Sequence, residues 1–73
     1  MSWKPEIKVH GENDFHTNAL RFATKDESDQ YALDLYRRWL MANEYRSTQC
    51  DDPVNYKWEN GQAIPLPKAE VNG

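Results

Sequence analysis

The sequence predicts an α+β fold, in which a single helix packs on one face of a small antiparallel sheet of about three to four strands. One uninterrupted segment, residues 24–45, places its apolar residues at the spacing of an amphipathic helix and contains no glycine or proline. The stretches on both sides of it alternate polar and apolar residues over short distances, which is typical of half-buried strands. With 73 residues, the chain has room for one such domain only.

The first strand is predicted at residues 6–10, where polar and apolar residues alternate. Ile7 and Val9 are expected to face the core, whereas Glu6 is expected to face water or a sheet edge. Residues 1–5, which include a proline, are expected to form a loose lead-in to this strand.

A hairpin is predicted next. Residues 11–14 are rich in turn-forming residue types, so the chain is expected to return antiparallel to the first strand from Phe15 onward. Leu20 and Phe22 resume a two-residue period and are candidates for a further short strand. Phe22 also suits packing over the first helical turn.

The predicted helix begins at a capping box. Thr24 would accept a hydrogen bond from a backbone N–H of the first turn, and Glu27 would reach back to the N–H of Thr24. Trp39 lies on the apolar face, and its replacement by alanine is expected to cost roughly 3–5 kcal/mol. The helix is expected to fray between residues 43 and 46, after roughly 30 Å. The apolar side gathers Ser28, Tyr31, Ala32, Leu33, Leu35, Tyr36, Trp39, Leu40, Ala42 and Asn43.

Strands are also predicted after the helix. Residues 45–50 are polar enough to indicate an edge strand, and residues 51–53 indicate a turn. Residues 54–58 alternate again. Asn60 and Gly61 then give the strongest hairpin signal in the chain, because both tolerate the positive φ of a type I′ turn.

The two-residue loop predicts the register of this second hairpin. Trp58 is set opposite Ala63, and Tyr56 opposite Pro65, with residues 62–66 as the returning arm. Pro65 has no N–H to donate, so this arm is expected at an edge.

Residues 1–66 are expected to form the single α+β domain, and the polar residues 67–73 a disordered tail. The formal net charge of −3 argues against a nucleic-acid backbone as the main partner. Cys50 is the only cysteine, so no internal disulfide can form and a reducing, cytoplasmic location is expected. The N-terminus lacks the apolar core of a signal peptide, and no apolar run approaches the ~20 residues of a membrane span. No membrane association is therefore expected.

Three segments of the chain carry a resemblance. They are NALRFATKDESDQYALDLYRRW (18–39), DDPVNYKW (51–58) and the Asn60-Gly61 pair that follows. Together they resemble a family of small uncharacterised proteins from bacteria and their phages, which share an FAT-K-E-E-A helix start, a DL-x-x-RW helix end and a DDPVNY-x-W motif. The resemblance covers residues 18–61 and implies a bacterial or phage setting and a shared fold, with no activity attached. Ser28 departs from the pattern, because a small apolar residue is expected there.

No catalytic, cofactor or metal site is predicted. The candidate metal ligands share no spacing such as C-x-x-C or H-x-x-x-H. They are His10, His16, Cys50, Asp51 and Asp52. A Cys50–His pair acting as nucleophile and base would also need an orienting group and an oxyanion site, which a two-layer domain of this size seldom provides. The chain is therefore expected not to be an enzyme and to need no cofactor.

The segment 51–58 is the most distinctive candidate binding site. Its simplest interpretation is a structured turn, in which aspartates satisfy backbone N–H groups and Tyr56 packs on the helix. The functional interpretation is an acidic, aromatic-edged loop that binds a basic protein. If the helix does not cover Tyr56 and Trp58, they form an exposed aromatic patch suited to a protein interface. The candidate protein-binding residues are Asp51, Asp52, Asn55, Tyr56 and Trp58.

A basic surface gives the alternative function. Cations interleaved with the rings of Tyr45 and Trp58 could bind a nucleic acid. These cations are Arg37, Arg38, Arg46 and Lys57. The ordinary interpretation is that the arginines pair with Asp34 and the rings fill the core. We therefore predict a bacterial or phage accessory protein, a monomer or weak homodimer, that binds an unknown protein partner in the cytoplasm. Nucleic-acid binding is the alternative.

Overall fold

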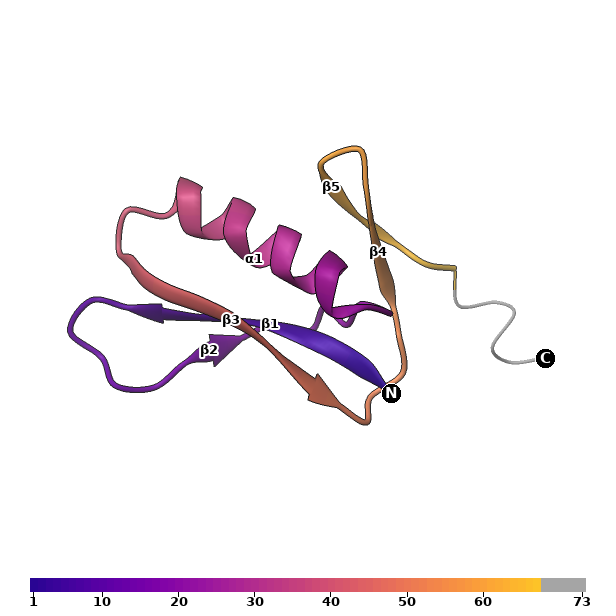
Figure 1. Cartoon of the computed structure of the whole chain (residues 1–73), viewed down its shortest axis with the longest axis horizontal. Helices are drawn as coiled ribbons and strands as arrows, with labels where there is room; N and C mark the ends of the chain where they lie inside the picture. The colour runs from indigo at the N-terminus through magenta and orange to yellow at the C-terminus, as the bar shows by residue number, and fades with distance from the viewer. Residues whose placement is uncertain (68–73) are drawn as a thin grey trace.

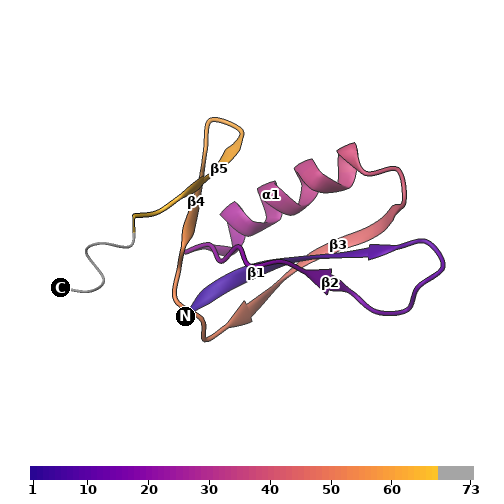
Figure 2. The same ribbon diagram turned by 180° about the vertical axis from the view of Figure 1, so that it is seen from behind.

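The computed structural model describes residues 1–67 and confirms the α+β fold (Figure 1). The elements in chain order are β1 (Ser2–Val9), β2 (His16–Thr17), α1 (Lys25–Arg38), β3 (Ala42–Cys50), β4 (Tyr56–Glu59) and β5 (Gln62–Pro65). An antiparallel sheet has the order β2-β1-β3, and α1 lies across one of its faces, against β1 and β3 (Figures 1 and 2). β4 and β5 form a separate hairpin. Of the predicted disordered tail, residues 68–73 lie outside the described residues.

β1 is longer than predicted. It has eight residues and begins at Ser2, so the prediction of a loose lead-in over residues 1–5 is wrong. The reason is that β3 offers partners along the whole strand, from Ser2 opposite Cys50 to Val9 opposite Ala42. β1 is thus the central strand of the sheet, and β3 lies at an edge, as predicted.

Pro5 is buried in the middle of β1, although proline is disfavoured in central strands. β2 pairs only with Glu6 and Ile7, so no partner strand requires an N–H from Pro5. The Thr17 hydroxyl instead donates to the Pro5 carbonyl at 2.8 Å. The shortness of β2 therefore makes a proline acceptable at this position.

Glu6 is buried, although it was expected to face water or a sheet edge. Arg46 Nε donates to its carboxylate at 2.6 Å, and the Thr48 hydroxyl donates at 2.8 Å. Burial by itself raises the pKa of Glu6, but the hydrogen bonds from Arg46 and Thr48 outweigh it and hold this pKa below its ordinary value of 4.5. Glu6 is therefore a bonded part of the sheet face that lies away from α1.

α1 is shorter than predicted. It has 14 residues, so the expected continuation to residues 43–46 is wrong. Trp39 is already extended, with φ −110° and ψ 107°, and the next two residues form a turn. Ala42 N–H donates to the Trp39 carbonyl at 3.0 Å, and Ala42 begins β3. Pairing with β1 satisfies the backbone of the following residues, and it prevails over their helical periodicity.

The capping box is confirmed in part. Thr24 Oγ1 accepts a hydrogen bond from Glu27 N–H at 3.1 Å. Glu27 Oε1, however, accepts from the Thr24 hydroxyl and not from its N–H. Glu27 Oε2 accepts from Trp58 N–H at 3.0 Å. One carboxylate thus joins the start of α1 to β4.

Phe22 is the centre of the core and is fully buried. It exchanges both backbone hydrogen bonds with Trp3, at 2.8 and 2.9 Å, and forms a single parallel bridge with Tyr56. Its ring lies 5.6 Å from that of Tyr31 and 6.5 Å from that of Tyr56. The strand suggested around Phe22 is therefore one residue that joins β1 to β4. Trp39, predicted as the main core residue, is 40% exposed, so that prediction is wrong.

Ser28 is also fully buried. The hydroxyl of Ser47, in β3, donates to its Oγ at 2.7 Å. A serine suits this position because the residue that faces it across the helix–sheet interface is polar.

The second hairpin has the predicted register, with Trp58 opposite Ala63 and Tyr56 opposite Pro65. Asn60 and Gly61 have φ of 53° and 78°, as their turn requires. The hairpin stands beside the N-terminal end of α1 (Figure 2).

Candidate functional site

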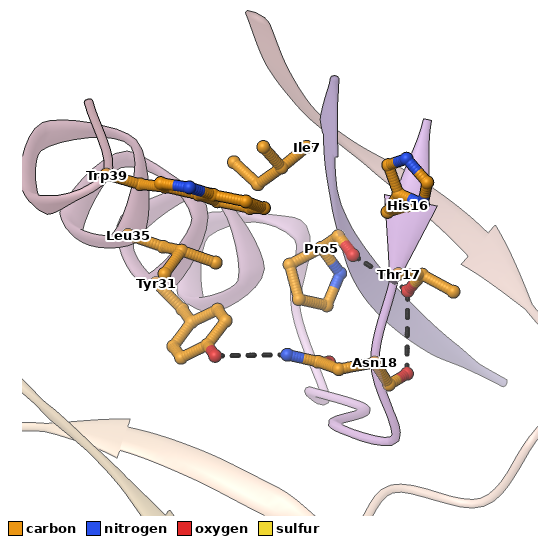
Figure 3. Close-up of a pocket in the computed structure, with 8 residues that line it drawn as sticks. All are labelled: Pro5, Ile7, His16, Thr17, Asn18, Tyr31, Leu35 and Trp39. Carbon is orange, nitrogen blue, oxygen red and sulfur yellow. Dashed lines mark hydrogen bonds between the residues drawn. The ribbon is translucent and has the colours of Figure 1, made fainter. Parts of the chain in front are cut away.

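An apolar groove lies between α1 and β2 (Figure 3). α1 lines it with Tyr31 and Leu35, which lie four residues apart on one helix face, and Trp39, the residue that follows α1, continues this line. β1 lines it with Pro5 and Ile7, alternate residues on the sheet face that α1 covers. The cavity volume is about 210 Å³, which is below the roughly 300–1,000 Å³ of most small-molecule sites. A single large side chain matches this size better.

The wall opposite α1 carries the polar groups of the groove. The Thr17 hydroxyl donates to the main-chain oxygen of the floor proline, and Asn18 Nδ2 donates to the Tyr31 hydroxyl at 3.0 Å (Figure 3). His16 Nε2 hydrogen-bonds the Glu12 carboxylate on the preceding loop. These polar groups are therefore occupied by the chain itself, and the surface left for a ligand is mainly apolar.

Trp39 lies at the more exposed end of this groove. β2 is two residues long, so it gives α1 little to pack against beyond β1 on this side. Trp39 is consequently 40% exposed. Its ring therefore carries the apolar surface of the groove out toward solvent.

The turn after Trp39 extends this apolar surface. Leu40 is 95% exposed and Met41 is 53% exposed. Single exposed apolar residues are common, but three in succession are unusual on the surface of a soluble protein unless they bind something. We call Trp39, Leu40 and Met41 the apolar end of α1.

Side chains of the predicted segment 51–58 form hydrogen bonds with residues 19–21 of the same chain. Asn55 Oδ1 accepts from Arg21 N–H at 2.7 Å, and Asn55 Nδ2 donates to the Ala19 carbonyl at 2.8 Å. Asp52 Oδ2 accepts from Arg21 Nε at 2.9 Å. The segment therefore holds residues 19–21 in place.

The aromatic residues of this segment are half-buried. Trp58 meets the ring of Tyr31 edge to face at 6.0 Å, and Tyr56 packs on Phe22. Asp51 is exposed. The observed contacts differ from the structured-turn interpretation, because Asp52 bonds the Arg21 side chain and Tyr56 packs on Phe22, which precedes the helix. The assignment of Asp51, Asp52, Asn55, Tyr56 and Trp58 to protein binding stays a prediction.

The four predicted cations are spread over different elements. Arg38 pairs with Asp34 on α1, Lys57 pairs with Glu59 on β4, and Arg46 pairs with Glu6 on the sheet face away from α1. Arg37 lies exposed in the last turn of α1. The structure does not bring these side chains to one surface.

Cys50 lies at one end of the sheet, opposite Ser2, whereas His10 follows Val9 at the other end. A hydrogen bond with the Ser2 hydroxyl, 3.2 Å from Sγ, lowers the pKa of the Cys50 thiol. The structure therefore brings Cys50 to neither histidine. Within residues 1–67, no three His, Cys, Asp or Glu side chains gather as a metal ion requires.

The exposure of the apolar end was not predicted, because the helical periodicity was assumed to continue past Arg38. Trp39, Leu40, Met41 and Ala42 are four consecutive apolar residues, and consecutive residues of a helix point 100° apart. A run of this kind cannot lie on one helix face. It was the signal that the helix ends and that part of the run is exposed.

Comparison with known protein families, with characterised proteins and with solved structures finds no match to this chain. The resemblance to small bacterial and phage proteins therefore stays a prediction. The helix found in residues 1–67 is neither long nor apolar enough to cross a membrane.

Proposed function

We propose that this chain is a small, non-enzymatic binding protein that receives an apolar side chain of a protein partner in the groove between α1 and β2. The apolar end of α1 forms the rest of the contact. Its exposure is the observation that carries the proposal, because aromatic and long apolar side chains in partly formed pockets are the usual anchors of protein interfaces.

Arg37 does not line the groove. It is exposed in the last turn of α1, and it lines another hollow together with Leu33 and Trp58. The fit to a partner therefore depends on a large apolar side chain that enters the groove and on further apolar contact with Leu40 and Met41.

The organism and the cellular compartment of the chain are part of the same proposal. The resemblance of residues 18–61 and the single cysteine favour a bacterial or phage protein that acts in the cytoplasm on a host or phage protein.

A capture experiment with paired variants tests the proposal. The tagged chain is compared with Leu40→Asp/Met41→Asp, which adds two charges to the apolar end. The matched control is Asn13→Asp/Gln62→Asp, which adds the same charges at exposed positions elsewhere. We expect a protein that the wild type and the control retain from bacterial lysate at high salt, and that the apolar-end variant loses.

Two results would count against the proposal. Equal retention by all three chains would remove the apolar end from the interface. Binding of DNA or RNA at low salt that falls steeply with added salt would favour the nucleic-acid alternative instead.

A further inference from the structure

β3 presents a free strand edge nine residues long. β1 pairs with it on one side, and no strand within residues 1–67 pairs with it on the other. Its only irregularity is opposite Lys8 and Val9, so residues 44–50 form a regular strand. It contains no proline and no lysine, and its two charged residues, Glu44 and Arg46, have opposite signs.

The backbone groups on the free edge can be assigned. Trp3 directs its N–H and C=O toward Phe22, and therefore away from β3. Its partner Gln49 must then direct its own groups away from β1, because opposite residues of an antiparallel pair share this orientation. Alternation along the strand places the groups of Ser47 and Tyr45 on the free edge as well.

We propose that β3 pairs antiparallel with β3 of a second copy of this chain, with Tyr45 on the two-fold axis, to form one continuous six-stranded sheet. In an antiparallel pair, residues that lie opposite each other point to the same face of the sheet. The two-fold axis must therefore pass between one residue and its own copy, and not between two neighbouring residues. A centre at Arg46 opposes two arginines, and a centre at Ser47 leaves Glu44 opposite Cys50. A centre at Tyr45 sets Glu44 opposite Arg46 of the second copy, twice, and places the irregular residues Ala42 and Asn43 at the two ends of the paired segment.

The charges on the outer sheet face support this register. Lys8 Nζ lies 3.0 Å from the Glu44 carboxylate, and Arg46 is paired with Glu6. Arg46 also lies over the Phe15 ring, with Cζ 3.8 Å from the ring centroid, so its guanidinium must turn from the β1 side toward the free edge to meet Glu44 of the second copy. Opposite charges that face each other across two strands stabilise the pairing.

The face that carries α1 also has room for a second copy. Two hollows lie along β3 on either side of Tyr45, of about 290 Å³ beside Asn43 and about 440 Å³ beside Ser47. Tyr36 stacks on Tyr45 with ring centroids 5.3 Å apart, and Tyr45 is 39% exposed. A helix seated over β1 and β3 would lie two strand spacings, roughly 10 Å, from its copy, which is a normal distance for packed helices.

Cross-linking reads the register directly. In a Cys50→Ser background, Tyr45→Cys is expected to form a disulfide-linked dimer under mild oxidation at least tenfold faster than Asn43→Cys or Gln49→Cys. The Cα atoms of opposite residues on the axis lie within reach of a disulfide, and the other pairs are offset along the strands. Faster cross-linking at either of the other positions would overturn the register.

Sedimentation of the full chain tests the charge pairing. Glu44→Lys is expected to weaken dimerisation by a factor of roughly 5–30, since two cross-strand pairs become repulsive. The control Glu59→Lys changes a carboxylate with the same 53% side-chain exposure and also paired with a lysine, but on β4, and is expected to leave dimerisation unchanged. A wild-type chain that stays monomeric at millimolar concentration would overturn the proposal. A dimer abolished by Leu40→Asp but not by Glu44→Lys would overturn it too, because self-association would then use the apolar end.

Discussion

The two ends of α1 meet the rest of the chain in different ways. At its N-terminal end, Phe22 is fully buried, and the side-chain oxygen and nitrogen of Asn55 bond the backbone of Arg21 and Ala19. At its C-terminal end, Trp39 is partly exposed and Leu40 is almost fully so. The difference teaches that burial in this small chain is concentrated where three distant segments meet, and that the other end is left available.

The largest effect is expected at Phe22, and it is best compared with the effect at Trp39 at the other end of α1. Phe22→Ala should lower the free energy of unfolding by roughly 3–5 kcal/mol, because it opens a cavity in the core. Trp39→Ala should cost only about 1 kcal/mol, which is typical of a partly exposed site. Urea unfolding followed by circular dichroism measures both. Equal losses would show that the two ends are packed alike.

A smaller loss is expected from Asn55→Ala. Removing its side chain leaves Arg21 N–H and the Ala19 carbonyl without their partner, which should cost roughly 1–3 kcal/mol in the free energy of unfolding. Asn43→Ala, at an exposed asparagine that follows the apolar end of α1, should change the free energy of unfolding by less than about 0.5 kcal/mol. Thermal unfolding of the two variants compares them, and a larger effect at Asn43 would contradict the assignment.

Acid should destabilise the fold through Glu6, a buried residue of the central strand β1. Its pKa is lower in the folded than in the unfolded chain, so its stabilising effect is complete above about pH 4.5 and is lost as the pH falls below that. Glu6→Gln should therefore be less stable at neutral pH and lose less stability on acidification. Unfolding free energies measured by urea titration at several pH values check this, with Glu59→Gln as the control for removing one carboxylate.

The smallest effect on stability is expected at the apolar end itself. Leu40→Asp and Met41→Asp should each change the free energy of unfolding by less than about 0.5 kcal/mol, because both side chains are mainly in water. Urea unfolding measures this. A loss of several kcal/mol would mean that the turn is packed, and would remove the basis of the proposed binding surface.

Local signals in the sequence were sufficient for much of this fold. The Thr24 cap and the Asn60-Gly61 turn depend on residues close together in the chain, and both were located correctly along with the hairpin register. The helix end was not, because it is decided by pairing of Ala42 with Val9, which are far apart in sequence. Periodicity has no information about such a partner.

The candidate site was harder to predict from the sequence, because it too depends on contacts between residues far apart in the chain. The segment 51–58 stood out by its composition, but Asn55 and Asp52 are explained by contacts with Arg21, which no spacing rule connects to them. The exposure of Leu40 follows from where the helix ends, so an error in that boundary carried directly into the choice of site residues.

The double role of Glu27 has a consequence for how the chain folds. A two-stranded hairpin is marginal alone in water, and a helix of this length is marginal too. Because one carboxylate bonds both the Thr24 hydroxyl and Trp58 N–H, opening the first helical turn also frees Trp58 N–H and weakens the attachment of the hairpin. The two elements should therefore form one cooperative unit, and the amide proton of Trp58 should exchange with solvent at the rate at which the start of α1 opens.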